Sequence, residues 1–200
     1  MKVQQWSGLV GVLGLALTAC GGSSIPNAVA SPSVDSGTNA NVPTAPVTSQ
    51  AIGADEQLIL DAVNAARSSA RTCGTTAFAA TTPLTWNAQL AAAARVHSED
   101  MALTGYRGTD TDPDAAHTGS DGSTPQQRIT QAGYAWKISG ENVAAGYTVG
   151  GSSDVVAAWL ISPGHCSNIM NPKYRDMGVS YVVNEKVKYG SFFTQDFGSR

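Results

Sequence analysis

The spacing of hydrophobic and polar positions divides this chain into three parts. Residues 9–19 form a short apolar run, and residues 23–53 are rich in Ser, Pro, Thr, Ala, Asn and Val without a sustained period. From residue 54 onward, apolar positions recur first at helical and then at strand spacing. We therefore expect a leader at residues 1–19, a tether at residues 20–53 and one folded domain at residues 54–200.

The domain begins with two segments that have the periodicity of amphipathic helices. In residues 55–71, Ile59 and Val63 fall on one helical face. Asn87 is then a suitable cap for a second helix reaching about residue 103, because its side chain can accept hydrogen bonds from the first helical turn. His97 lies within the apolar stripe of this second helix, so we expect it to pack there.

Two shorter helices are expected further along the chain. Thr124-Pro125 is a favourable helix start, with Thr as the cap and Pro at the first position, and Gly133 ends that helix. A fourth helix is expected over residues 153–161. Pro163-Gly164 should break it and begin a turn that carries His165.

The end of the chain has the clearest strand pattern. Side chains alternate from Met177 to Val183, Asn184-Glu185-Lys186 form a turn, and Val187 to Phe197 return as a second strand. Helices in the first three-quarters of the domain, followed by this hairpin, predict an α+β fold with helices packed against a small antiparallel sheet.

The leader has the features of an export signal. Lys2 supplies a positive start, and the apolar run is too short to span a bilayer as a mature helix. Leu17-Thr18-Ala19-Cys20 resembles a bacterial lipobox, in which Cys20 becomes the lipidated first residue after cleavage; a plain secretory signal with an incidental cysteine is the alternative. Both interpretations place the protein outside the cytoplasm, where disulfides are stable.

Composition narrows the choice of partners. The 200 residues contain 12 Lys and Arg against 15 Asp and Glu, a formal net charge of −3, so the chain lacks the basic surface that a nucleic-acid-binding protein uses. The tether has Asp35 as its only charge and no aromatic residue, so it cannot bury enough apolar surface to fold. We expect a monomer held to the membrane through Cys20.

A series of short motifs then points to a family. In chain order they are Leu84-Thr85-Trp86-Asn87, His97-Ser98-Glu99-Asp100-Met101, His117-Thr118-Gly119, Gly140-Glu141-Asn142, Ser162-Pro163-Gly164-His165, Asn168-Ile169-Met170-Asn171-Pro172 and Thr194-Gln195-Asp196-Phe197-Gly198. With this order and spacing, residues 57–198 resemble a bacterial CAP domain, also called SCP-like (cysteine-rich secretory proteins, antigen 5, pathogenesis-related 1). The resemblance implies an α-β-α sandwich with a cleft on one side.

In the eukaryotic branch of the family, that cleft holds two histidines and two acids. His117 matches the first histidine and Glu141 matches the acid of Gly-Glu-Asn, whereas Ser162 and Phe192 stand where the other two would lie. His165 belongs to the Ser-Pro-Gly-His motif of bacterial members and can reach the same cleft from another element. The implied ligand-binding residues are His117, Glu141, His165 and Asn142.

Two imidazoles and a carboxylate are a plausible set of ligands for Zn²⁺ or another divalent metal, with an open position for water. A hydrogen-bonded polar cluster without a metal is the alternative for His117, Glu141 and His165. Loop acids at Asp110, Asp112, Asp114 and Asp121 do not have EF-hand spacing, so we expect them to be solvated. The tryptophans Trp86, Trp136 and Trp159 are expected in the core.

Cysteine chemistry offers two interpretations. Cys166 as a thiolate nucleophile is disfavoured, because adjacent residues such as His165 rarely face each other and the compartment is oxidising. A disulfide between Cys73 and Cys166 fits better, since these are the two cysteines of the folded domain.

We therefore expect an exported, lipid-anchored CAP-domain protein whose His/Glu cleft binds a small molecule, a lipid, a metal or an envelope protein, without established catalysis. The alternative function is a metal-dependent, peptidase-like hydrolase of the cell envelope. In that case Glu141 would be the base, and His117 and His165 would be the metal ligands.

Overall fold

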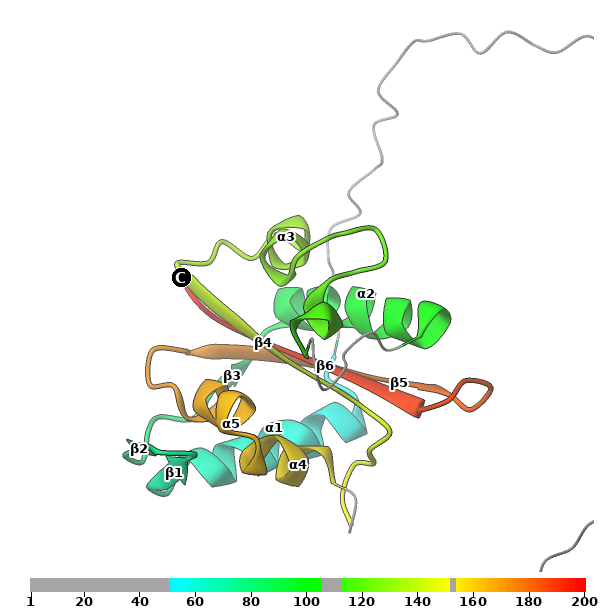
Figure 1. Cartoon of the computed structure of the whole chain (residues 1–200). Helices are drawn as coiled ribbons and strands as arrows, with labels where there is room; N and C mark the ends of the chain where they lie inside the picture. The colour runs from blue at the N-terminus through cyan, green and yellow to red at the C-terminus, as the bar shows by residue number, and fades with distance from the viewer. Residues whose placement is uncertain (1–50, 106–112, 152–153) are drawn as a thin grey trace, which may run out of the picture. The chain divides into compact units, whose positions relative to one another are not determined.

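The computed structural model describes residues 51–105, 113–151 and 154–200 of this chain. A four-stranded sheet forms the middle layer, with α2 (Ala88–Thr104) and α3 (Pro125–Gln131) on one face. The other face carries α1 (Ala54–Arg67), α4 (Val155–Ile161) and α5 (Pro163–Met170), as Figure 1 shows. The predicted α+β fold and α-β-α sandwich are confirmed.

The strand order in this sheet is β3-β5-β6-β4. The strands are β3 (Thr85–Trp86), β4 (Ile138–Ala145), β5 (Asp176–Asn184) and β6 (Gly190–Ser199). The predicted terminal hairpin is confirmed as β5 and β6, and β4 pairs antiparallel to β6. The short edge strand β3 is parallel to β5, so the sheet is mixed and not wholly antiparallel. After β3 the chain enters α2 and does not turn back into a neighbouring strand, so β3 has no hairpin partner and pairs with the distant β5.

Local sequence signals explain where several helices begin. The Asn87 side chain accepts hydrogen bonds from the backbone N–H groups of Gln89 and Leu90 at 3.0 and 3.1 Å, so the expected cap is present. Thr124 and Gln127 bond each other's backbone N–H groups in a capping box at the start of α3.

Two local predictions were wrong. The first helix stops at Arg67, and the residues after it form a separate hairpin of β1 (Arg71–Cys73) and β2 (Thr76–Phe78). Gly74 turns this hairpin with a φ of 62°, a conformation in which glycine is favoured. Pro163 does not open a turn but occupies the first turn of α5, where its missing N–H costs no helical hydrogen bond.

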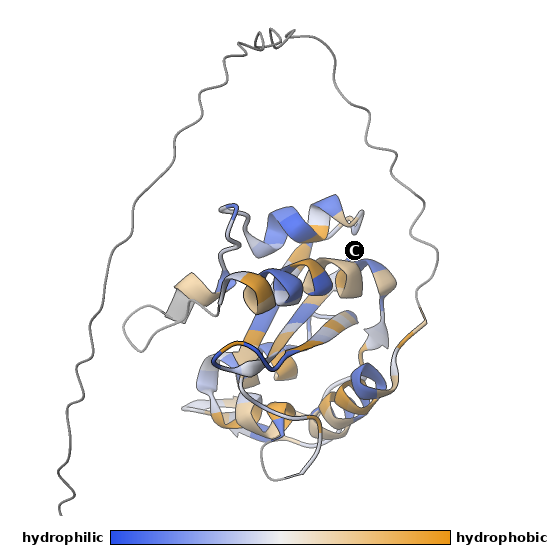
Figure 2. Ribbon diagram, turned by 90° about the vertical axis from the view of Figure 1, so that its right-hand side faces the viewer, coloured by the Kyte–Doolittle hydropathy of each residue, from blue (hydrophilic) through white to orange (hydrophobic). Residues whose placement is uncertain are grey.

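The larger core cluster lies between the sheet and the layer of α1, α4 and α5. Ile59, Trp159 and Phe193 are each no more than 1% exposed within it. Figure 2 shows hydrophobic segments on the helix and strand faces that meet in the interior. Trp86 is partly buried against this core, whereas Trp136 is 37% exposed, so its expected core position was wrong. Its indole N–H donates to Thr130 Oγ1 at 3.0 Å on the surface of α3.

Within the ranges given above, no helix combines the length and apolar character needed to cross a bilayer.

Candidate functional site

Three elements bring one acid and two cationic or ionisable side chains together. Glu141 lies on β4, His117 ends a short 3₁₀ helix (η1, Pro113–His117), and Arg128 lies on α3. One Glu141 oxygen lies 2.7 Å from His117 Nδ1, and the other accepts a hydrogen bond from Arg128 Nη2 at 2.7 Å. Arg128 Nη2 also donates to the His117 backbone carbonyl at 3.0 Å. The predicted proximity of His117 and Glu141 is present as a direct contact.

The charge of Glu141 follows from these contacts. Burial alone would raise the pKa of its carboxyl group, but the hydrogen bond from His117 and the charge of Arg128 outweigh it and hold the pKa below its usual value. Both carboxylate oxygens are already engaged, and the Glu141 side chain is only 2% exposed. This geometry suits an anchor for His117 better than a base that accepts a proton from water.

His165 reaches the same region from α5. Burial lowers the pKa of its imidazole, and the nearby charge of His117 lowers that pKa further. His165 is therefore neutral near pH 7 and can both donate and accept a hydrogen bond. No hydrogen bond between its side chain and Glu141 or His117 is present in the described ranges, so the three residues share a neighbourhood and not one bonded cluster.

Asn142 does not lie with these side chains. Successive residues of a strand point to opposite faces of a sheet, so Asn142 faces away from Glu141. Its amide group is fully buried and donates to the His165 carbonyl at 3.3 Å and to Gln195 Oε1 at 3.0 Å. Asn168 donates in turn to Asn142 Oδ1 at 2.9 Å. Asn142 thus holds α5 on the sheet and offers no surface for the predicted ligand contact.

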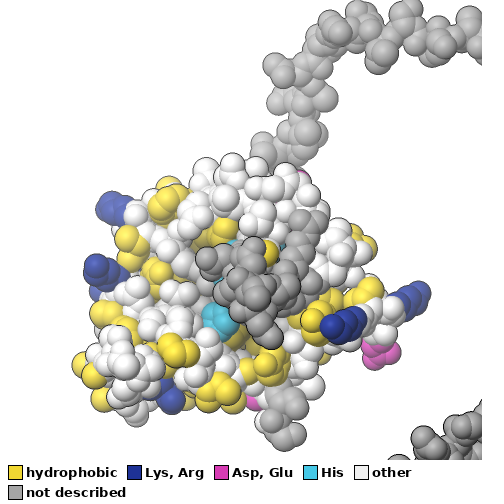
Figure 3. Space-filling model, in the orientation of Figure 1, with side chains coloured by type: hydrophobic (Ala, Val, Ile, Leu, Met, Phe, Trp, Pro, Cys, Tyr) yellow, Lys and Arg dark blue, Asp and Glu magenta, His cyan; other side chains and the backbone are white. Residues whose placement is uncertain are grey.

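A cavity of about 280 Å³ opens beside His165. Its walls come from β4 and the residues after it, from α4 and from the start of α5; they are Val143, Ala144, Ala145, Tyr147, Ala158, Trp159, Ser162 and His165. Most of these side chains are apolar, with a hydroxyl and an imidazole as the main exceptions. Figure 3 shows imidazole surface exposed among hydrophobic side chains on one face of the molecule. The arrangement is suited to a small ligand with one polar group.

Metal ligation by the predicted trio has limited geometric support. In the part of the chain that the structure describes, no group of three His, Cys, Asp or Glu side chains is arranged to hold a metal ion. If the His117 Nδ1–H donates to Glu141, the other ring nitrogen carries a free lone pair, as in many carboxylate-supported histidine ligands. Zn²⁺ or another divalent ion therefore stays a prediction for His117 and His165.

The other sequence predictions have separate outcomes. Cys73 and Cys166 form the expected disulfide, with Cα atoms 5.5 Å apart. His97 packs in α2 as expected, 1% exposed, with Nε2 2.7 Å from the Ala116 carbonyl oxygen. Asp121 is exposed and accepts a hydrogen bond from the Ser123 N–H, as a solvated loop acid does.

Several predicted residues cannot be placed. Cys20, Asp110 and Asp112 lie outside the described residues, and the side chain of Asp114 is not described either.

Two polar residues of this region were not singled out by sequence. Arg128 is 3% exposed and neutralises Glu141, and Asp196 is fully buried opposite Glu141 in the β4–β6 register. A lone arginine on a short helix carries no local signal of burial. Asp196 stands inside the Thr-Gln-Asp-Phe-Gly motif, and because it lies directly opposite Glu141 on the paired strand, the two side chains share one face of the sheet.

Comparison with known proteins identifies the domain. Residues 60–197 match the profile of the family described as "CAP: Cysteine-rich secretory protein family". The chain is 33% identical over 115 residues to YkwD, an uncharacterised protein of Bacillus subtilis, a match that covers 58% of this chain and 39% of the relative. The chain thus spans well under half of that relative's length.

Two solved structures are similar to this chain. An outer surface protein of Borrelia burgdorferi aligns with a TM-score of 0.56 at 20% identity, covering 73% of this chain and 92% of that protein. An extracellular SCP-domain protein of Bacillus anthracis is 30% identical, with a TM-score of 0.46, over 60% of this chain and 35% of its own. The first likeness supports the fold, and neither identifies a ligand.

Proposed function

Because the chain belongs to the cysteine-rich secretory protein (CAP) family, we propose that it is an exported binding protein whose cavity beside His165 takes a small, mostly apolar molecule with one polar group. The observation that carries this proposal is the lining of that cavity, in which apolar walls from β4 and α4 meet the polar side chains of Ser162 and His165.

The size and polarity of the cavity define the ligand class. A volume of about 280 Å³ lies just below the range of small-molecule pockets, which is about 300–1,000 Å³. Each methylene group buried against such walls contributes roughly 0.8 kcal/mol. A short alkyl chain or a compact ring fits this description better than a long lipid tail enclosed along its whole length.

The polar end of the ligand would meet His165 and Ser162. Because burial lowers the pKa of His165, its ring is neutral near pH 7 and one nitrogen can donate while the other accepts. A hydroxyl or carboxyl head group satisfies such partners. When the pH falls through the lowered pKa of His165, the imidazole gains a charge, which would favour a carboxylate over a neutral alcohol.

The hydrolase alternative has less support from this geometry. It needs Glu141 as a proton acceptor, yet His117 and Arg128 occupy both of its oxygens and lower its pKa. Binding without a chemical step is therefore the better description of the site, and turnover that Glu141→Gln abolishes without loss of folding would overturn it.

Export and anchoring complete the proposal. The leader before Cys20 and the Cys73–Cys166 disulfide both fit a protein that matures in an oxidising compartment. A lipid on Cys20 and a random-coil tether would hold the domain roughly 30 Å from the membrane. Cys20→Ser should move the protein from the membrane fraction to the soluble fraction; a variant that stays with the membrane would exclude this anchor.

Binding can be tested with two homologous series, n-alkanols and n-alkanoates of four to ten carbons, titrated into the folded protein by calorimetry. Ala158 lines the cavity, so Ala158→Phe should fill it and weaken binding at least about tenfold. Ala157→Phe is the matched control, because Ala157 is exposed on the same helix and lies outside the cavity wall. The absence of saturable binding, or equal effects of the two variants, would reject the proposal.

A further inference from the structure

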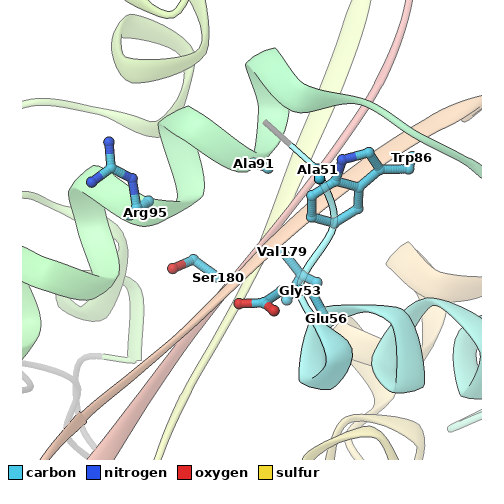
Figure 4. A pocket seen from close by; sticks show the side chains of 8 residues that line it. All are labelled: Ala51, Gly53, Glu56, Trp86, Ala91, Arg95, Val179 and Ser180. Atoms are coloured by element: carbon cyan, nitrogen blue, oxygen red, sulfur yellow. The ribbon is translucent and has the colours of Figure 1, made fainter. Parts of the chain in front are cut away.

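A second hollow lies at the opposite edge of the sheet, where β3 pairs with β5. It has a volume of about 180 Å³ and shares no lining residue with the cavity beside His165. Figure 4 shows it between the start of α1 and the side of α2, with Trp86, Glu56 and Ser180 around it. The proposed function does not involve this hollow, so the polar side chains that line it must be explained in another way.

Ser180 presents a hydroxyl group that the protein itself does not use. The residue is only 5% exposed, and its backbone carbonyl accepts a hydrogen bond from Ser98 Oγ at 3.3 Å. Its own hydroxyl has no hydrogen-bond partner among the described residues, and Ser180 is one of the residues that line the hollow, labelled in Figure 4. A hydroxyl on the wall of a hollow, without a partner in the protein, is available to a ligand as donor or acceptor.

Glu56 adds an unpaired carboxylate to the same hollow. It is the third residue of α1, and no ion pair or side-chain hydrogen bond to it occurs in the described ranges. An acid in a first helical turn favours the helix through the helix dipole, but Asp55 already stands in that turn and is exposed. The Glu56 carboxylate lies beside Gly53 on the wall of the hollow, and it forms no capping hydrogen bond there.

The remaining walls determine the sign and shape of what fits. Arg95 also lines the hollow, but its guanidinium group already bonds Glu99 at 3.0 Å, so the uncompensated charge is the carboxylate of Glu56. Trp86 and Val179 supply apolar surface beside it. An acid next to an indole ring favours a cation on an apolar stem, since the ring can attract the cation and the carboxylate can pair with it.

We propose that this hollow binds an alkylammonium group of the kind that a lysine side chain presents. The ammonium group donates hydrogen bonds to Glu56 and to the Ser180 hydroxyl oxygen, and the methylene stem lies against Trp86 and Val179. A volume of about 180 Å³ is enough for one such chain. The partner class is therefore a lysine-bearing peptide or a comparable primary amine outside the cell.

The test compares Nα-acetyl-lysine amide with Nα-acetyl-norleucine amide, which has the stem without the charge. Binding to the whole protein is followed by calorimetry and by the indole N–H resonance of Trp86. We expect saturable binding of the lysine compound, a shift of that resonance and no measurable binding of the norleucine compound. Failure of the lysine compound to bind, or equal binding of both, would overturn the proposal.

Matched variants locate the site. Glu56→Gln removes the carboxylate charge and should weaken binding roughly five- to tenfold, because a partly exposed ion pair is modest in strength. Asp55→Asn makes the same charge change one residue away, outside the hollow, and should leave binding unchanged. Ser180→Ala provides a second variant, with an expected loss of about threefold or more. Equal losses in Glu56→Gln and Asp55→Asn would show a general charge effect and reject the site.

Discussion

Glu141 is the residue that holds the polar side chains of His117 and Arg128 together. It joins η1, α3 and β4 through His117 and Arg128, and almost none of it is exposed to solvent. A buried ion pair is not strongly stabilising by itself, but the loss of one partner leaves the other charge buried without compensation. The role of Glu141 is therefore to keep Arg128 and His117 in place.

Replacing this carboxylate should be costly. Glu141→Gln leaves the Arg128 guanidinium, whose Nε already lacks a hydrogen-bond partner, as an uncompensated buried charge. We expect a loss of about 3–5 kcal/mol in the free energy of unfolding, measured with urea. Glu99→Gln is the control, since the Arg95–Glu99 pair is about half exposed and should contribute less than about 1 kcal/mol. Similar losses in both variants would contradict the anchoring role.

Asp196 should give an opposite pH dependence to that of an ordinary acid. It is fully buried, its oxygens lack hydrogen-bond partners, and burial followed by the charge of Glu141 raises its pKa well above 3.8. The unfolded chain therefore loses this proton at lower pH than the folded chain does. The contribution of Asp196 to stability is largest below about pH 4 and falls as the pH rises towards its folded pKa.

Asp196→Asn tests this effect, because it keeps the shape of the side chain and removes its titration. We expect the variant to gain stability relative to the wild-type protein as the pH rises from about 4 to 8. Unfolding in urea at several pH values gives the difference directly. A difference that stays constant over this range would show that Asp196 ionises at its usual pKa, and a change in the opposite direction would show a lowered pKa; both contradict the prediction.

At the scale of elements, the close approach of α2 to β5 depends on one glycine. A Cβ atom at Gly178 would overlap the backbone of Leu90 and Ala91 in the first turn of α2. A side chain at position 178 would push the backbone of α2 away from that of β5 and so lift the helix from the sheet. The small side chains of α2, with Ala93 and Ala94 almost fully buried, suit the same close packing.

Gly178→Ala should therefore be strongly destabilising, by at least about 1–3 kcal/mol, because the added methyl group has only backbone atoms to displace. Gly164→Ala is a suitable control, since its new Cβ in α5 would have no heavy atom within 4 Å other than those of its chain neighbours and its own helix backbone. Thermal unfolding of the two variants measures the difference. A Gly178→Ala protein as stable as the wild-type protein would show that α2 can shift without cost.

At the scale of the whole molecule, the layer of α1 and α5 is held by links between distant parts of the chain. The Cys73–Cys166 disulfide joins β1 to α5 across 93 residues. Arg67 reinforces it by donating hydrogen bonds to the carbonyls of Ile169 and Asn171 at 2.6 and 3.0 Å. Both links fix the helix that carries His165, so the cavity wall depends on the integrity of this layer.

Removal of the disulfide should lower the stability of the domain without changing its fold. For the double variant Cys73→Ala and Cys166→Ala, the loss of loop closure predicts about 4–5 kcal/mol less free energy of unfolding. Cys20→Ser, which removes the remaining cysteine, should leave that free energy unchanged. Urea unfolding with and without a reductant checks both, and a wild-type protein that is insensitive to reductant would contradict the prediction.

Local signals determined much of this protein from sequence alone. The cap at Asn87, the capping box at Thr124 and the β5–β6 hairpin each depend on residues within a few positions of one another, which is why their patterns were sufficient. The motif order indicated the family and placed His117, Glu141 and His165 near one another. The disulfide could be predicted because the domain contains one pair of cysteines.

Only the tertiary structure decided which polar groups meet. Arg128 pairs with Glu141, Asn142 bonds the His165 carbonyl and Gln195, and Glu56 shares a hollow with Ser180, although none of these relations has a local signature. The short hairpin after α1 and the helix that begins at Pro163 also depend on packing against distant residues. A contact between side chains far apart in the chain is determined by how layers pack, and neighbouring residues carry little information about it.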